Sequence, residues 1–269
     1  MTQISTGQIE DLLVKSRSGQ ITDQDLDAFL KRPKLWQDLS SESAAVSLPT
    51  PENAQEFWQG VYGELGIKVE VPPLRRLTPK QKKSLTKFGF MLVYISEITE
   101  AEYPASFVKP DWGSYITASS IERMPLKGAW VAVETIRKSD RDDLEGYPDD
   151  RLLTALGRNS RFRTSHDCLT SELLVKIAKT TGFPKKGTGL PTVEQWNFVA
   201  NLFNWLREHR GLDLPDLGST RSWEWCQNVC GSERRLLVGR SARGGLADVS
   251  YGWRALRSGR ISFRVLVVL

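Results

Sequence analysis

The sequence lacks the features that mark secreted and membrane proteins. Its 269 residues include three cysteines, an odd number that does not fit the disulfide framework of a secreted domain. No apolar run approaches the ~20 residues that cross a membrane. The first residues, MTQISTGQIEDLL, have neither the basic nor the apolar part of a signal peptide. We expect a reduced protein without a membrane span, either cytoplasmic or associated with a virion or cell surface by an unknown route.

Histidine is also scarce, which leaves little for catalysis or metal binding. His209 falls in the last turn of an expected helix, where a cation suits the helix dipole. His166 begins the triplet HDC, but neighbours in sequence rarely form a catalytic group in space. Cys226 and Cys230 have no second pair or nearby histidine, so small buried hydrophobes are expected rather than zinc ligands. The acidic cluster at 140–150 does not match EF-hand spacing and is expected to be a solvated loop. We expect no catalytic residue, no metal site and no cofactor.

The C-terminal segment 234–269 lacks lysine, glutamate, glutamine and methionine altogether. It holds eight arginines and a single acidic residue, Asp248, which gives a net charge of +7. Residues 1–233 carry 29 basic and 31 acidic side chains, a net charge of −2, so the positive charge of the chain is local. Arginine, serine, glycine, alanine, leucine, tyrosine and tryptophan remain, and this composition is typical of a recognition surface.

Apolar spacing and capping residues predict the helices. Helical patterns occur over 7–17, 22–31, 51–65, 78–87, 170–182 and 190–211. Thr192 and Gln195 form the pattern of a capping box, and Gly211 ends the same helix. In the shorter helix, Thr170 is the expected cap and Gly182 the expected stop.

Alternating or apolar runs predict the strands. They occur over 67–71, 88–98, 128–136, 222–229, 234–240, 245–253 and 261–269. Residues 137–163 are charged and rich in turn residues, so a long surface excursion is expected there. The expected fold class is α+β.

Four segments resemble a known family in the correct order. LPTVEQWNFVA (190–200) resembles a helix motif of the formylglycine-generating enzymes, and SWEWCQN (222–228), RRLLVGRSARGGLADV (234–249) and ISFRVLVVL (261–269) resemble its later elements. The resemblance implies a C-type lectin fold of the formylglycine-generating-enzyme-like type. The chain also resembles the variable proteins of diversity-generating retroelements, which share this fold. In those proteins a C-terminal variable region is rewritten by adenine-directed mutagenesis and ends in an unmutated apolar strand.

The resemblance implies a division of the chain and a cause for its composition. The resemblance covers about residues 85–269. We expect an N-terminal helical region over 1–75, for docking, display or oligomerisation, and a lectin-like domain over 76–269. The variable region would span about 234–262. Randomised adenines in AAC or AAT codons cannot produce lysine, glutamate, glutamine, methionine or tryptophan. Trp253 is therefore the exception in this segment and is expected to belong to the scaffold.

The expected function is non-catalytic, receptor-type ligand binding, with an unidentified protein or other macromolecule as partner. The residues expected at or near the binding face are Arg240, Ser241, Arg243, Ser250, Tyr251, Arg254, Ala255, Leu256, Arg257, Ser258 and Arg260. Those expected in the core are Leu236, Val238, Leu246, Val249, Phe263, Val265 and Val267. Trp223, Trp225 and Trp253 are expected to buttress the fold.

Two alternatives remain. An arginine-rich surface with aromatic residues could bind nucleic acid or another polyanion. The oxidase members of the resembled family instead bind copper through a C-terminal cysteine pair. The matching stretch here, residues 249–263, holds no cysteine, so a copper oxidase is the weaker alternative.

Overall fold

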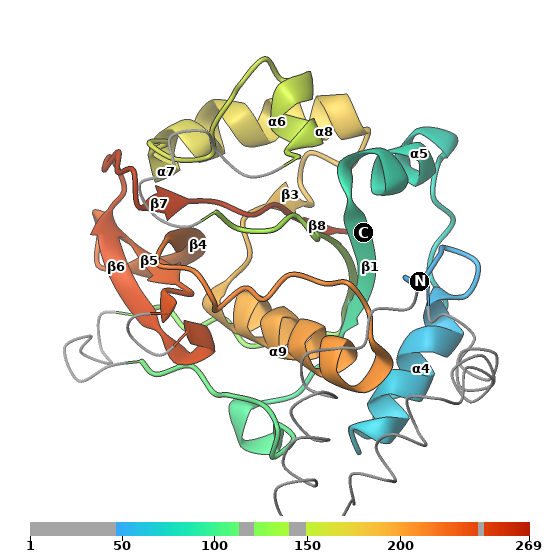
Figure 1. The fold of residues 1–269 in the computed structure, drawn as a ribbon. Coiled ribbons are helices and arrows are strands. Elements are labelled where there is room, and N and C mark those ends of the chain that lie inside the picture. The colour runs from blue at the N-terminus through green and yellow to red at the C-terminus, as the bar shows by residue number, and fades with distance from the viewer. Residues whose placement is uncertain (1–46, 113–120, 140–148, 242–244) are drawn as a thin grey trace, which may run out of the picture. The chain divides into compact units, whose positions relative to one another are not determined.

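The computed structural model describes residues 47–112, 121–139, 149–241 and 245–269. The helices expected over 7–17 and 22–31 lie outside these residues, as does most of the acidic cluster at 140–150. Residues Leu48–Leu269 form one compact unit. This unit combines helices with two four-stranded sheets, which confirms the expected α+β class (Figure 1).

The first sheet has the strand order β1-β2-β8-β3, and each pair in it is antiparallel. Its strands are β1 (Phe90–Ile95), β2 (Ala129–Glu134), β8 (Leu266–Val268) and β3 (Thr188–Gly189). The apolar runs correctly predicted β1 and β2. All six residues of β1 are buried, because three helices contact this strand.

The second sheet has the order β6-β5-β4-β7. Its strands are β4 (Trp223–Cys230), β5 (Arg234–Val238), β6 (Val249–Trp253) and β7 (Ile261–Ser262). β7 pairs with β4 in parallel, and the other pairs are antiparallel. A short 3-10 helix, η5 (Gly245–Ala247), precedes β6. β6 therefore forms one edge of the sheet that carries most of the arginine-rich segment.

The apolar ending of the chain, expected as one strand over 261–269, is divided between the two sheets. β7 lies in the second sheet and β8 in the first, and residues 263–265 connect them. The prediction of a single strand is wrong because Arg264, in the connection, binds side-chain and backbone acceptors from other elements. The last residues of the chain thus contribute one strand to each of the two sheets.

The strand expected over 67–71 is also absent from the structure. Glutamine side chains of α4 (Ala54–Glu64) take the backbone hydrogen bonds that a neighbouring strand would make. Gln55 Nε2 donates to the carbonyl of Val71 at 2.9 Å, and Gln59 Nε2 donates to that of Val69 at 3.0 Å. The backbone N–H of Val71 donates to Gln59 Oε1 at 2.9 Å. The backbone groups of this extended segment therefore find their hydrogen-bond partners on a helix rather than on a neighbouring strand.

Capping explains where the helices begin. Thr78 and Gln81 form a capping box at the start of α5 (Pro79–Phe88), and Thr192 and Gln195 form the predicted one at α9 (Val193–Arg210). Gly211 ends α9 with a φ of 63°, a left-handed conformation that glycine adopts without strain. The shorter elements are α6 (Arg151–Ala155) and the 3-10 helix η1 (Glu100–Glu102).

The helix expected over 170–182 begins earlier than predicted. α7 (His166–Cys168) continues through a π-helical turn, η3 (Leu169–Leu173), into α8 (Leu174–Thr181). Ser165 is the cap, and its side chain accepts from the N–H of Cys168. Thr170 instead lies within the helix, and its hydroxyl donates to the carbonyl of His166 at 3.1 Å. Gly182 ends the helix as predicted.

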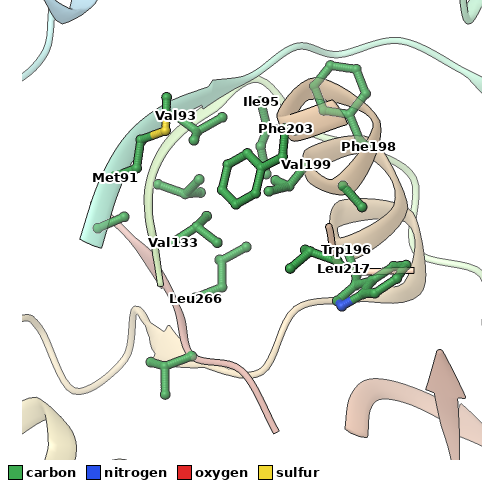
Figure 2. Packing of buried hydrophobic residues seen from close by; sticks show 14 of the residues in the cluster. Met91, Val93, Ile95, Val133, Trp196, Phe198, Val199, Phe203, Leu217 and Leu266 are labelled. Carbon is green, nitrogen blue, oxygen red and sulfur yellow. The ribbon is translucent and has the colours of Figure 1, made fainter. Parts of the chain in front are cut away.

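The core lies around α9, which contacts β1 of the first sheet and β4 and β5 of the second. Figure 2 shows Val199 and Phe203 facing the side chains of the first sheet, with Trp196 near Leu217. Phe198 packs with Tyr62, Tyr103 and Phe107. The seven residues expected in the core are all buried: Leu236, Val238, Leu246, Val249, Phe263, Val265 and Val267.

The described part of segment 137–163 does not lie wholly at the surface, where its charge suggested it would be. In its described part, Lys138, Leu152, Arg161 and Phe162 are buried. Charged side chains reach the interior here because each finds a partner, as the next section describes.

Candidate ligand-binding surface

Buried ion pairs hold the framework beneath the arginine-rich segment. Arg264 is 1% exposed and donates to Glu224, with Nη2–Oε1 at 3.0 Å and Nε–Oε2 at 3.3 Å. Its Nη1 donates to the carbonyls of Glu134 and Ile136 at 2.8 and 2.9 Å. Trp196 Nε1 donates to Glu224 at 2.6 Å. Arg264 is thus part of the scaffold, although it counts toward the positive charge of the segment.

The same interior holds an unusual lysine. Lys138 Nζ donates to the carbonyls of Ser222 at 3.0 Å and Gly239 at 2.6 Å. Burial lowers the pKa of Lys138 to about 8, against the opposing attraction of Glu224. Burial alone would raise the pKa of Glu224, but Arg264 and Lys138 outweigh it and the pKa is lowered.

A second buried network fixes the chain on either side of Arg264. Arg161 donates to both carboxylate oxygens of Glu134, at 2.6 and 2.7 Å, and to Asp150 at 2.6 and 3.0 Å. It also donates to the carbonyl of Phe263 at 3.2 Å, and Glu134 accepts from the N–H of Val265 at 2.7 Å. Sequence reasoning missed these partners. The available signal was the lone charge in each of two apolar strand patterns, GAWVAVETI and ISFRVLVVL.

At the other end of β5 from Glu224, an arginine and two aromatic rings form an accessible cluster. Strand pairing places Arg234 of β5 opposite Trp253 of β6, two residues from Tyr251. The Arg234 guanidinium lies 4.6 Å from the Tyr251 ring centroid and 4.7 Å from that of Trp253. Both distances are within cation–π range. We call Arg234, Tyr251 and Trp253 the aromatic cluster.

Trp253 does not buttress the fold, contrary to expectation, because it is 56% exposed. It ends the edge strand β6, and the preceding Gly252 packs so closely on the ring of Trp225 that an added Cβ would lie 3.1 Å away. The interior position is therefore already filled by Trp225. Trp223 and Trp225 are buried, as expected.

The residues expected at the binding face are accessible where they are described. Those that are exposed are Ser241, Ala255, Leu256, Arg257 and Arg260. Those that are half-buried are Arg240, Ser250, Tyr251, Arg254 and Ser258. Arg243 lies outside the described residues. Access is necessary for contact with a ligand; the binding itself remains a prediction.

Some of these residues also have partners within the chain. Arg254 Nε lies 2.9 Å from a carboxylate oxygen of Glu233 and 3.7 Å from one of Asp167. The carbonyl of Ser258 accepts from the N–H of Arg163 at 3.0 Å. Arg240 lies over the Trp223 ring at 5.9 Å. The aromatic cluster, Ala255, Leu256 and Arg257 therefore form the most suitable contact surface, and we call these six residues the C-terminal surface.

The two thiols on β4 are buried. Cys226 and Cys230 are buried on β4, as expected for small hydrophobes, and burial raises the pKa of Cys226 well above its usual value. In the described parts of the chain, no three or more His, Cys, Asp and Glu side chains gather as a metal site would require. Likewise, no described helix is both long and apolar enough to cross a membrane.

Comparison with known proteins leaves the chain without an assigned family. No protein-family model matches the sequence, and no curated protein matches it.

Proposed function

We propose that this protein is a non-catalytic, receptor-type ligand-binding protein with a C-type lectin fold of the formylglycine-generating-enzyme-like type. Its C-terminal surface would be diversified by a retroelement and would bind a protein or other macromolecule. The observation that carries the proposal is the aromatic cluster: an arginine over two accessible rings, on the sheet whose strand β4 supplies Glu224 to a buried ion pair.

A diversified surface needs a framework that does not depend on it. The aliphatic side chains of β5 and β6 are buried, and Arg264 and Arg161 fix the ending of the chain through buried carboxylates. Of the hydrophobic residues of the C-terminal surface, Tyr251 packs against this core, whereas Trp253, Ala255 and Leu256 do not belong to it. Their replacement should therefore leave the fold intact, which is what repeated rewriting of a surface requires.

The aromatic cluster has the chemistry of an interface anchor. Tyrosine, tryptophan and arginine dominate binding energy at protein interfaces, and aromatic rings lose little conformational entropy when they bind. Tryptophan cannot arise from adenine changes in AAC or AAT codons, so Trp253 would be a fixed anchor among variable positions. Leu256, 40% exposed, adds apolar area a few residues away.

The structure weakens the case for the polyanion alternative. Arg264 is buried against Glu224, and Arg254 lies beside Glu233 and Asp167. The positive charge available to phosphates is thus smaller than the eight arginines of segment 234–269 suggest. For the copper-oxidase alternative, both cysteines near this segment are buried on β4.

Two matched libraries test the proposal. The surface library randomises seven accessible residues: Ser250, Tyr251, Arg254, Ala255, Leu256, Arg257 and Ser258. The core library randomises seven buried ones: Leu236, Val238, Leu246, Val249, Phe263, Val265 and Val267. Both are displayed on yeast, scored for protease resistance, and then selected against an unrelated soluble protein.

We expect most surface variants to stay protease-resistant and some to bind the selecting protein, whereas most core variants should be cleaved. Equal cleavage of the two libraries would contradict the proposal. The neighbouring DNA provides a second test: a reverse transcriptase gene and a near-copy of the 3′ coding end that differs only at adenines would support diversification. A complete locus without them would refute it.

Salt dependence separates the polyanion alternative. A nucleic-acid site should lose most of its affinity for single-stranded DNA between about 50 and 200 mM salt, because binding releases counterions from the phosphates. We expect this protein to bind single-stranded DNA only weakly at low salt, and we expect its affinity not to fall steeply as the salt concentration rises.

A further inference from the structure

A cleft with a volume of about 620 Å³ is lined by residues other than those of the C-terminal surface. It is lined by the helical run that begins at His166, by the loop that leads into β3, and by residues of β3, β4, β5 and β8. None of the six residues of the C-terminal surface lines it. Its size is within the range that encloses small organic ligands.

The cleft is positively charged. Lys185 and Lys186 reach it from the loop before β3, and Arg235 reaches it from β5. The described residues that line the cleft include no aspartate or glutamate. Within the described part of the chain, no ion pair is formed by any of these three cations. Three uncompensated cations around one concavity attract an anion, because the low-dielectric walls focus their field.

The rest of the lining is largely apolar. Its apolar side chains are Met124, Leu174, Val175, Leu190, Val229, Leu266 and Val268. Gln227 also lines the cleft, and its amide donates to the carbonyl of Leu190. The lining thus pairs cations with an apolar wall, which suits a ligand that has both a charged and an apolar part.

His166 gives an independent sign of an unfilled polar site. The residue is 6% exposed, lines the cleft, and packs edge-on against Trp225 with ring centroids 5.9 Å apart. Its Nε2 is buried without a hydrogen-bond partner among the described residues, which is uncommon for a buried polar atom. Burial, followed by the charge of Arg235, lowers the pKa of His166 to about 4, so the ring is neutral at pH 7.

We propose that this cleft binds a small amphiphilic anion, with its anionic head near Lys185, Lys186 and Arg235 and its apolar body against the apolar wall. The shared chemistry is an anionic group, such as a carboxylate, sulfonate or phosphate, on an aliphatic or aromatic body. This site is separate from the proposed ligand-binding surface and does not depend on it.

A pair of fluorescent probes tests both parts of the ligand. Anilinonaphthalene sulfonate carries an anionic head on an aromatic body, and phenylnaphthylamine is its neutral counterpart. The full-length protein and the variant Lys185→Gln/Lys186→Gln are titrated with each probe. Lys82→Gln/Lys83→Gln removes the same two charges at adjacent exposed positions on α5 and serves as the matched control.

We expect the sulfonate to bind wild-type protein and the control variant equally. Loss of two exposed cations should weaken its binding to Lys185→Gln/Lys186→Gln up to about tenfold, with little change for the neutral probe. Val175→Trp, which fills the cleft from a half-buried position, should weaken both probes. Circular dichroism and thermal unfolding establish that each variant is folded.

Three outcomes would overturn the proposal. Equal sulfonate affinity in wild-type protein and the Lys185→Gln/Lys186→Gln variant would show that these cations bind no anion. Unchanged binding to a folded Val175→Trp variant would place the probe outside the cleft. Loss of the sulfonate signal in Trp253→Ala would place it on the C-terminal surface.

Discussion

Replacing Arg264 by methionine tests whether this arginine is part of the framework or of the surface charge. Its guanidinium makes four hydrogen bonds, two to the Glu224 carboxylate and two to backbone carbonyls. Both side chains of the ion pair are at most 1% exposed. Methionine fills similar space but removes the two guanidinium hydrogen bonds to the buried carboxylate of Glu224, whose charge Trp196 and Lys138 also stabilise.

Removing one partner of such a buried pair costs about 3–5 kcal/mol of the free energy of unfolding. The matched surface change is Arg254→Met. Arg254 lies 2.9 Å from Glu233, but the two side chains are 43% and 52% exposed, so this pair contributes less than about 1 kcal/mol. Urea unfolding followed by circular dichroism measures both values at 25 °C.

The reasoning also predicts a partial rescue. In Arg264→Met/Glu224→Gln the buried negative charge is gone, while the glutamine oxygen still accepts from Trp196. The double variant should be more stable than Arg264→Met alone. If Arg264→Met does not fold, Arg264→Lys, which keeps the charge but loses the forked geometry, supplies the measurement at a smaller cost. Equal costs for Arg264→Met and Arg254→Met would refute the division of these arginines into framework and surface.

Three further predictions follow from burial. Trp253→Ala should lower the free energy of unfolding by less than about 1 kcal/mol because the ring is largely exposed, whereas the buried Trp225→Ala should lower it by about 3–5 kcal/mol. Thermal and urea unfolding compare the two variants, and a large loss of stability in Trp253→Ala would mean that the ring is not on the surface. The lowered pKa of His166 favours its neutral form in the folded state, so this contribution to stability is present above pH 6.5 and is lost as the pH falls toward 4. Across this window, the free energy of unfolding should therefore change by about 2–3 kcal/mol less in His166→Gln than in the wild-type protein. The lowered pKa of Lys138 predicts that the free energy of unfolding of the wild-type protein rises between about pH 8 and 10.5 relative to that of Lys138→Met. If the free energies of unfolding of the two proteins vary with pH in the same way over this range, that pKa is contradicted.

Most of the local structure could be predicted from the sequence because it depends on nearby residues. The capping box of Thr192 and Gln195 and the stop at Gly211 use hydrogen bonds within one turn of the chain. The aliphatic residues of β5 and β6, such as Leu236, Val238 and Val249, could be assigned to the core before any partner strand was known. The predicted face residues that the structure describes are accessible, but Trp253, which was expected in the scaffold, is exposed.

The failures share a different physical cause. The extended segment at 67–71 finds its hydrogen-bond partners on α4, and sequence patterns do not show which distant group will satisfy a backbone. Arg161 and Glu134 are buried because they meet, and each alone would have been assigned to the surface. Burial of a charge depends on a partner that can lie anywhere in the chain.

The arginine-rich segment shows what the sequence determines by itself and what the tertiary structure adds. Its composition, eight arginines with no lysine and one acid, is a property of the sequence and needs no structure. Only the tertiary structure decided that Arg264 is buried against Glu224, that Arg254 lies beside Glu233, and that Trp253 is exposed beside Arg234. The physical reason is that the energy of a charge or a ring depends on its burial and partners, and these are set by contacts between segments far apart in the chain.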